Sequence, residues 1–398
     1  MLLPVEEALE RVKAAFGPLP AEQVSVADAL GRVLADDVEA RVTQPPAAVS
    51  AMDGYAVRAA DVAEPPVVLR TIGEAPAGGV YEGTVGPGEA VRIFTGGPVP
   101  DGADAIVIQE DTESQDDRVT VRVSAPEGNY IRPAGLDFSA GVVGLRAGRR
   151  LTPRDVGLAA AMNVPWLAVR RKPRVALLAT GDEIVRPGDP LGPHQIVSSN
   201  TLALAALVTE AGATPIDLGI ARDNEDSLRR MAAAAAGADL LVTSGGASVG
   251  ERDLVQQVLG KVGLELDFWR IAMRPGKPLM FGRIGATPLL GVPGNPVSAL
   301  VCGLLFLRPA IGVMLGVEDE QPAAETAVLG CDLDANDRRQ DYLRARLERG
   351  PEGELVAIPF PRQDSSMLST LVAAGCLVVR PPQAPPGKAG DRVEIIRL

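Results

Sequence analysis

Residues Arg174–Glu183 read RVALLATGDE, and this stretch decides the fold class. Val175–Ala179 is an unbroken apolar run, which is typical of a strand that is buried on both faces of a sheet. The next four residues, Thr180–Glu183, form a glycine turn that carries two carboxylates. A buried strand that ends in a polar glycine loop is how a βα unit begins, so we predict a parallel α/β sheet here.

The same pattern repeats as far as Gly316. Strand, loop and helix recur about every 30 residues, which predicts a central, doubly wound, mostly parallel sheet. The expected strands lie at 175–179, 216–220, 240–243, near 268 and at 289–290, and the expected helices at 201–211, 227–236, 252–259 and 296–306.

The flanking segments differ from this central region in their pattern of apolar residues. Val5–Phe16, Ser25–Leu34 and Pro153–Met162 carry apolar residues at helical spacing. Val119–Val123 alternates with period two among short apolar runs cut by glycine and proline, which indicates a β-rich insertion. Strand-like runs after Glu318 flank a loop rich in proline and glycine and predict a small β-barrel or sandwich. We therefore predict a multi-domain α/β protein with a helical domain at 1–45 and 135–172, an inserted β-rich domain at 46–134, the central α/β domain at 173–318 and a C-terminal β-barrel at 319–398.

The composition excludes several classes of function. A chain of 398 residues with a net charge of −12 has room for several domains but lacks the basic excess that nucleic acid or an anionic membrane requires. Its three cysteines form no C-x-x-C pair and its one histidine is His194, which argues against a disulfide framework, a zinc site or a histidine-based triad. Residues 1–7 do not resemble a signal peptide, and the most apolar run, Val297–Leu307, is about half as long as a membrane span, so we expect a cytoplasmic protein.

Four loops at the carboxyl ends of the predicted strands are candidates for binding an anionic substrate. Ligands of open α/β sheets bind beyond these ends, where glycines let backbone N–H groups approach a phosphate. Neither the G-x-G-x-x-G dinucleotide motif nor a P-loop is present. We therefore expect a phosphate-bearing, nucleotide-like substrate that is held without the standard nucleotide motifs. The four loops are Thr180–Glu183, Thr243–Asp253, Arg274–Pro278 and Gly291–Ser298.

Together with two N-terminal motifs, these loops closely resemble the molybdopterin molybdenumtransferase family, to which the E domain of gephyrin belongs. The N-terminal motifs are Ser50–Ala56, which reads SAMDGYA, and Arg92–Pro100, which reads RIFTGGPVP. The resemblance implies a homodimer whose active cleft lies between one subunit's central domain and the partner's N-terminal half. The implied reaction inserts molybdate into adenylylated molybdopterin and releases AMP, with Mg²⁺ or another divalent cation.

The resemblance also implies roles for single residues. Asp223 and Asp253 would hold the metal, since Mg²⁺ binds a pyrophosphate through one or two carboxylates and waters. The residues expected to bind the substrate are Thr180, Gly181, Asp182, Ser244, Gly245, Gly246, Ser248, Pro293, Gly294, Asn295 and Ser298. Those expected to act on the reacting groups are Glu183, Arg270, Arg274, Lys277, Arg344 and Ser365, with Asp53, Thr95 and Asp137 closing the cleft from the partner subunit.

Alternative functions stay open at this point. The central domain alone would suit a molybdopterin adenylyltransferase or a molybdopterin-binding module, and a non-catalytic scaffold is a third alternative. The Ser50–Asp53 segment and the additional domains favour insertion, with an adenylyltransferase as the protein that supplies the substrate. Three positions depart from the family pattern: Leu136 replaces a glutamate, Ser198 an aspartate, and Asp364 a glycine beside the expected molybdate site.

Overall fold

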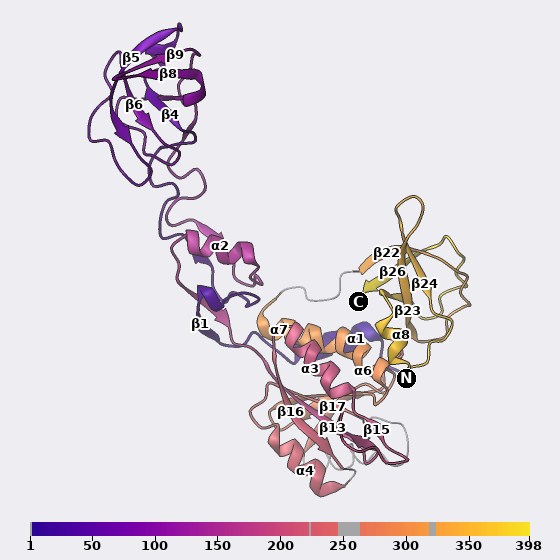
Figure 1. The fold of residues 1–398 in the computed structure, drawn as a ribbon. Coiled ribbons are helices and arrows are strands. Elements are labelled where there is room, and N and C mark those ends of the chain that lie inside the picture. Colours follow the sequence, from indigo (N-terminus) through magenta and orange to yellow (C-terminus); the bar gives the residue numbers. More distant parts are fainter. Residues whose placement is uncertain (1, 223, 246–262, 318–323) are drawn as a thin grey trace. The chain divides into compact units, whose positions relative to one another are not determined.

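The computed structural model describes residues 2–222, 224–245, 263–317 and 324–398 (Figure 1). The chain divides into two compact units. The first consists of Met1–Glu22, Gly31–Ala35 and Val169–Leu398, and the second of Gln23–Leu30 and Asp36–Ala168. The four predicted domain ranges stay a prediction.

A six-stranded mixed sheet forms the centre of the first unit, which confirms the predicted α/β class. Its first four strands are parallel, whereas β20 runs antiparallel to both of its neighbours. β20 was not expected from the sequence. From β13 the chain goes to β16 on one side and then to β17 on the other, so the topological switch point lies between the carboxyl ends of β13 and β17. The strand order is β16 (Thr214–Ala221), β13 (Arg174–Thr180), β17 (Leu240–Ser244), β21 (Thr287–Val292), β20 (Met280–Ile284) and β18 (Leu264–Trp269).

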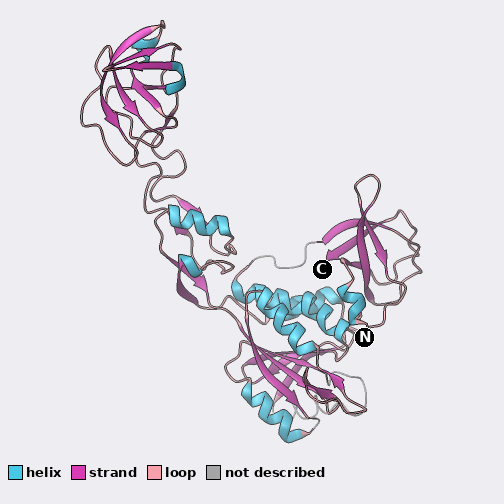
Figure 2. Cartoon of the chain, in the orientation of Figure 1, coloured by secondary structure: helices cyan, strands magenta, loops and turns pink. Residues whose placement is uncertain are grey.

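Both faces of this sheet are covered by helices (Figure 2). Successive residues of β13 point to opposite faces, so Val175 and Leu177 pack in one core cluster while Ala176 and Leu178 pack in another. This is why the sequence of the strand is continuously apolar. The first face is covered by α1 (Val5–Ala14), α3 (Asn200–Glu210), α6 (Pro296–Cys302), the π-helical segment η4 (Gly303–Leu307) and α7 (Arg308–Leu315), and the other by α4 (Glu225–Ala234).

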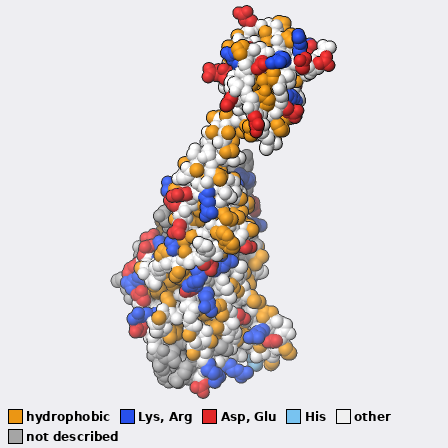
Figure 3. Space-filling view, turned by 90° about the vertical axis from the view of Figure 1, so that its left-hand side faces the viewer, with side chains coloured by type: hydrophobic (Ala, Val, Ile, Leu, Met, Phe, Trp, Pro, Cys, Tyr) orange, Lys and Arg blue, Asp and Glu red, His pale blue; other side chains and the backbone are white. Residues whose placement is uncertain are grey.

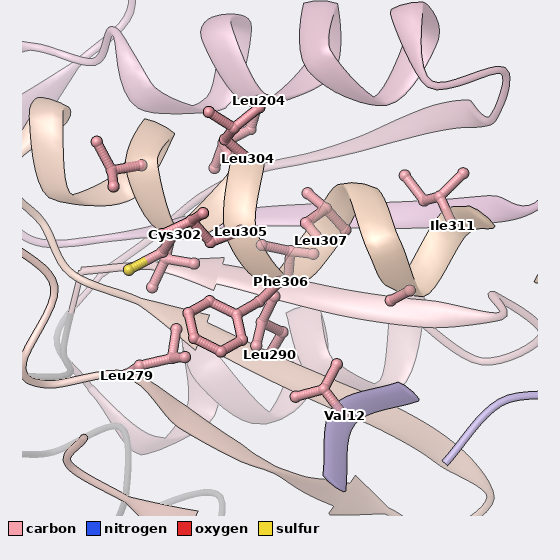
Figure 4. Packing of buried hydrophobic residues seen from close by; sticks show 14 of the residues in the cluster. Val12, Leu204, Leu279, Leu290, Cys302, Leu304, Leu305, Phe306, Leu307 and Ile311 are labelled. Carbon is pink, nitrogen blue, oxygen red and sulfur yellow. The ribbon is translucent and has the colours of Figure 1, made fainter. Parts of the chain in front are cut away.

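The segments α6, η4 and α7 join into one helix, Pro296–Leu315, at the centre of the first core. Phe306 is fully buried and lies beside Leu279 and Leu290 (Figure 4). By length and composition this helix could cross a membrane, because its mean hydropathy is 2.0, but 72% of its most apolar window is buried, as in the core helix of a globular protein. The expected helix at 296–306 was therefore too short.

A closed five-stranded barrel follows, which confirms the predicted C-terminal barrel. A short strand, β19 (Met273–Arg274), pairs with β23 from outside, and this pairing places Arg274 opposite Asp341. The short helix α8 (Leu368–Val372) precedes β25. The barrel consists of β22 (Ala324–Leu329), β23 (Gln340–Arg349), β24 (Leu355–Pro359), β25 (Cys376–Arg380) and β26 (Arg392–Arg397).

The second unit contains another six-stranded sheet, as the β-rich texture predicted. Tyr55 packs in a cluster on one face and Ala56 in a cluster on the other, so both faces are buried. The strand order is β7 (Ala105–Ile108), β4 (Gly54–Val57), β6 (Glu89–Ile93), β5 (Val67–Ala75), β9 (Arg118–Val121) and β8 (Thr112–Gln115).

Shorter elements complete this part of the chain. The predicted helix at 153–162 is α2 (Pro153–Ala161), which begins with a capping box between Thr152 and Asp155. The predicted helix at 25–34 is wrong. Residues 21–25 form β1 (Ala21–Ser25), and a three-residue 3-10 turn follows because the Ser25 hydroxyl accepts a bond from the Ala27 N–H, 3.2 Å away. The remaining strands pair as β1 with β12 (Trp166–Arg170), β2 (Val38–Glu39) with β11 (Val143–Leu145) and β3 (Val49–Ser50) with β10 (Ile131–Arg132).

The close approach of β4 to β7 generates the first prediction. A Cβ on Gly54 would lie 2.0 Å from the backbone oxygen of Val107, so Gly54→Ala must displace a strand and is expected to destabilise the second unit by about 1–3 kcal/mol or more. In contrast, a Cβ on Gly157 in α2 meets no atom within 4 Å, and Gly157→Ala is expected to stabilise by about 0.5–1 kcal/mol. Urea unfolding of the full chain, with residues 36–168 followed by hydrogen exchange, measures both. Equal stability of the two variants would contradict the prediction.

Candidate active site

A cavity of about 520 Å³ opens at the carboxyl ends of β13 and β16 in the first unit. Gly181 and Asp182, both predicted from the sequence, line it together with Arg186 and Arg222, which were not predicted. Both arginines directly follow a strand, and this position in the sequence could have identified them as candidates. Glu183 folds back over the turn, since a Cβ on Gly181 would come within 2.6 Å of its carboxylate oxygen. The cavity wall therefore combines glycine backbone, carboxylates and two guanidinium groups.

Two buried threonines lie near the carboxyl ends of neighbouring strands: Thr180 is the last residue of β13 and Thr243 the last but one of β17. Thr180 Oγ1 and Thr243 Oγ1 have no hydrogen-bond partner among the described residues. Gly245 lies directly against Thr180: its φ is +94°, and a Cβ there would lie 2.6 Å from the Thr180 backbone oxygen. Unpartnered buried hydroxyls are rare in folded proteins, so this strand end is suited to an additional hydrogen-bonding group. Gly246, Ser248 and Asp253 of the same loop lie outside the described residues.

Asn200, at the start of α3, joins the loops that follow β17 and β21. Its Nδ2 donates to Ser244 Oγ at 2.9 Å and to the Gly294 carbonyl at 2.7 Å. The loop after β21 also contains Pro293, and Ser298 is buried in the first turn of α6. The structure therefore brings together predicted residues from two loops through an asparagine that the sequence analysis did not select.

The loop after β21 also contacts the C-terminal barrel. Asn295 Nδ2 donates to Ser365 Oγ at 2.7 Å, and the Val297 N–H donates to the Ser365 carbonyl at 3.1 Å. Ser365 and Asn295, which were predicted separately for molybdate and for the nucleotide phosphate, are thus in direct contact. The contact joins the loop between β21 and α6 to the segment between β24 and α8.

Arg344 lies on β23, and its side chain is buried near the same segment, with 1% of the residue exposed. Its Nε donates to Gln363 Oε1 at 3.2 Å and its Nη1 to the Met367 carbonyl at 3.3 Å. Burial lowers the pKa of this guanidinium, and the negative charge of Asp364 opposes that effect. The Asp364 carboxylate itself accepts bonds from the Ser366 hydroxyl at 2.6 Å and from the Ser366 N–H at 2.8 Å, which lower its pKa in that order.

The three predicted cations near residues 270–278 differ in their surroundings. Arg274 pairs with Asp341 and lies 3.5 Å from Asp337, so its charge is already shared with carboxylates of the barrel. Burial raises the pKa of Asp341, and the bond from Arg274 opposes that shift. Arg270 has a φ of +78° and stacks on Trp269 at 4.2 Å, while its buried Nε has no partner among the described residues. Lys277 makes no ion pair within the part of the chain that the structure describes.

Two of the three predicted residues in the second unit are in direct contact. Asp53 Oδ1 accepts hydrogen bonds from the Thr95 N–H and from Thr95 Oγ1, each 2.7 Å long. The N–H bond and then the hydroxyl bond lower the pKa of Asp53, with a further contribution from Arg92. Asp137 is exposed, and its N–H donates to the Gln44 carbonyl at 3.0 Å. No described contact joins it to the other two.

The predicted metal ligands cannot be placed. Asp223 and Asp253 both lie outside the described residues. Within residues 2–222, 224–245, 263–317 and 324–398, no group of three or more His, Cys, Asp or Glu side chains could hold a metal ion. The assignment of Asp223 and Asp253 to the metal, which the family resemblance implies, therefore stays a prediction.

Three family models match successive parts of the chain: the MoeA N-terminal region (domain I and II) at residues 3–163, a probable molybdopterin binding domain at 176–312, and the MoeA C-terminal region (domain IV) at 326–398. A molybdopterin molybdenumtransferase of Nostoc sp. is 40% identical over 331 residues, which cover 81% of this chain and 76% of the relative. Molybdopterin molybdenumtransferase 2 of Mycobacterium tuberculosis is 37% identical over 382 residues, 94% of either chain.

Solved structures show the same similarity in three dimensions. A molybdopterin biosynthesis MoeA protein from Pyrococcus horikoshii matches with a TM-score of 0.86 at 33% identity, covering 100% of this chain and 99% of that one. A second structure from Pyrococcus horikoshii OT3 matches with a TM-score of 0.87 at 28% identity over 100% of both chains.

The contact between Asp53 and Thr95 predicts a measurable pKa. Thr95→Val removes the hydroxyl donor but keeps the N–H, so the pKa of Asp53 is expected to rise part of the way toward its ordinary value of 3.8. Since the pKa is lowered in the folded protein, ionised Asp53 stabilises the fold above pH 3.8, and this contribution is lost as the pH falls below that value. Carbon-13 NMR titration of Asp53 measures the shift, with Thr95→Ser as the control. An unchanged pKa in Thr95→Val would rule out the role of the hydroxyl.

Proposed function

This chain belongs to the molybdopterin molybdenumtransferase family and is a transferase that inserts molybdenum in molybdenum-cofactor synthesis, and from that premise we propose how it works. The proposed substrates are adenylylated molybdopterin and molybdate. Insertion is coupled to cleavage of the pyrophosphate, and AMP is released. The observation that carries the proposal is the contact between Asn295 and Ser365, which joins the substrate-binding loops of the sheet to the barrel segment beside buried Arg344.

The pyrophosphate of the substrate would bind at the switch point of the sheet. Gly181 and Gly245 both have positive φ angles and no side chain, so a phosphate can approach their backbone closely. The unpartnered hydroxyls of Thr180 and Thr243 would supply further donors. The net charge of −12 makes the cations local to the site decisive, and Lys277 and Arg270 are suited to this role because no carboxylate among the described residues pairs with either.

Molybdate, a tetrahedral dianion, would bind near Arg344 and Ser365. The Arg344 guanidinium is nearly buried, and charge-assisted hydrogen bonds gain strength when water is excluded. Asp364 replaces a family glycine here. Its carboxylate accepts two hydrogen bonds from Ser366, so its negative charge is partly neutralised within its own turn. We propose that Arg274 does not contact the oxyanion in the state described, because Asp341 and Asp337 share its charge.

Mg²⁺ would be held by Asp223 and Asp253. Two carboxylates are the donor set that Mg²⁺ prefers when it also binds phosphate oxygens and waters. When bound, the ion would neutralise charge that develops on the pyrophosphate as it is cleaved. The described residues would orient the substrate on either side of the pyrophosphate bond that is cleaved.

We further propose a cytoplasmic homodimer. The partner's N-terminal half would supply Asp53, Thr95 and Asp137, and the low pKa of Asp53 keeps that carboxylate ionised at neutral pH. Three scattered cysteines without a C-x-x-C pair, Cys302, Cys331 and Cys376, support a reducing compartment. A separate adenylyltransferase would supply the substrate.

AMP release tests this proposal. The purified protein is incubated with adenylylated molybdopterin, molybdate and Mg²⁺, and AMP and dithiolene-bound molybdenum are followed. Asp253→Asn is expected to lower the rate at least about 100-fold, because even an outer partner of a metal site contributes 10–100-fold. The control is Asp226→Asn, which removes an exposed carboxylate from α4 and should react like the wild type.

Two results would overturn the proposal. Tight binding of adenylylated molybdopterin without AMP release, under any divalent metal, would identify a carrier or scaffold. Formation of adenylylated molybdopterin from ATP and molybdopterin would identify an adenylyltransferase instead.

A further inference from the structure

The Asp53–Thr95 pair lies beside a partly buried cation–aromatic stack in the second unit. The Arg92 guanidinium, on β6, lies 5.2 Å from the centre of the Tyr55 ring and 5.0 Å from that of Phe94. Tyr55 follows Asp53 by two residues and Phe94 precedes Thr95 by one. The two rings therefore fix Arg92 between the chain segments that carry the pair.

Arg92 also bonds to the residue after Asp53 and to a residue that holds the Asp53 carbonyl. Its Nη1 donates to the Gly54 carbonyl at 3.0 Å, and its Nη2 donates to Gln109 Oε1 at 2.7 Å. Gln109 in turn donates its backbone N–H to the Asp53 carbonyl at 3.0 Å. These three bonds form a closed ring, because Asp53 and Gly54 are neighbours in the chain. Arg92 reaches Gly54 directly and reaches Asp53 through Gln109.

This ring of hydrogen bonds leaves Asp53 with one oxygen held and one free. Oδ1 accepts both bonds from Thr95, whereas Oδ2 has no bonding partner among the described residues. The two carbonyls that follow the Asp53 Cα, those of Asp53 and Gly54, are held by Gln109 and Arg92. A carboxylate held in this way presents its second oxygen in a single direction, which is the arrangement that a substrate contact requires.

We propose that Arg92 and Gln109 are positioning residues that orient Asp53 and Thr95 for molybdenum insertion, although neither touches the substrate. The inference rests on the proposed assignment of Asp53 and Thr95 to the active site. A planar guanidinium suits this task because its fork donates in two fixed directions while its faces stack on aromatic rings. Lysine offers one compact charge and cannot satisfy both acceptors with the same geometry.

The test compares Arg92→Met with Arg70→Met in the full-length enzyme. Methionine keeps the apolar length against Tyr55 and Phe94 but removes the charge and both donors. Arg70 lies on β5 of the same sheet and pairs with Glu89 at 2.5 Å, so its replacement controls for the loss of a guanidinium from this unit. The measurements are kcat and KM for AMP release, the carbon-13 pKa of Asp53, and the thermal unfolding temperature.

We expect Arg92→Met to lower kcat by about 10- to 100-fold, the effect of misplacing a reacting group, with little change in KM. The pKa of Asp53 should rise, because Arg92 contributes to its lowering after the two Thr95 bonds. Arg92→Lys should keep the low pKa but recover kcat only in part. Arg70→Met should leave kcat, KM and the pKa unchanged.

A merely structural role would lower the unfolding temperature but leave kcat and the Asp53 pKa of the folded fraction as in the wild type, and this result would overturn the proposal. Should Arg92→Met fail to fold, Gln109→Met interrupts the same ring of hydrogen bonds while Arg92 keeps its bond to Gly54. A kcat within two-fold of the wild type in that variant would equally overturn it. Asp53→Asn distinguishes failure of the active-site assignment from failure of the positioning role. Full activity of Asp53→Asn refutes the assignment of Asp53 to the active site. A loss of activity in Asp53→Asn but not in Arg92→Met refutes only the role of Arg92.

Discussion

The rest of the structure depends on the burial of both faces of the central sheet. Strand β13 sends Val175 and Leu177 into one core and Ala176 and Leu178 into the other, so a polar group without a partner is costly on either face. In the central strands β13, β17 and β21, polar side chains therefore occur only at or next to the strand ends. The switch point places the carboxyl ends of β13 and β17 at one edge of the sheet. The same burial requires the long helix Pro296–Leu315, whose apolar length serves the core.

Charge at the site follows from the way each cation is held. The chain is acidic, so a cation already paired with a carboxylate gains little by binding an anionic substrate. Arg274 is paired in this way, whereas Arg344 is buried against neutral acceptors from Gln363 and Met367. Burial opposes the charge on Arg344, and a dianion nearby would offset that cost. The second unit uses the opposite arrangement, a carboxylate kept ionised by Thr95 and Arg92.

Much of the fold could be predicted because strands buried on both faces and glycine loops leave local signals. The errors arose where tertiary contacts override the local pattern of apolar and polar residues. Ser25–Leu34 has helical spacing, yet Leu30 is 61% exposed and the Ser25 hydroxyl bonds to the local backbone. β20 carries both a glycine and an arginine in five residues, and only pairing with β18 and β21 makes it a strand.

The sequence by itself determined the class of the fold, the position of the substrate loops after the strands, and the family to which their motifs belong. These properties depend on residue type and short-range spacing, which any single chain displays. Only the tertiary structure decided which partners the functional residues have: Arg274 with Asp341, Asn295 with Ser365, and Arg92 with Gln109. Such contacts join distant segments, and a hydrogen bond forms only within a narrow range of donor–acceptor distances. Strand register and packing must therefore be known before these pairs can be identified.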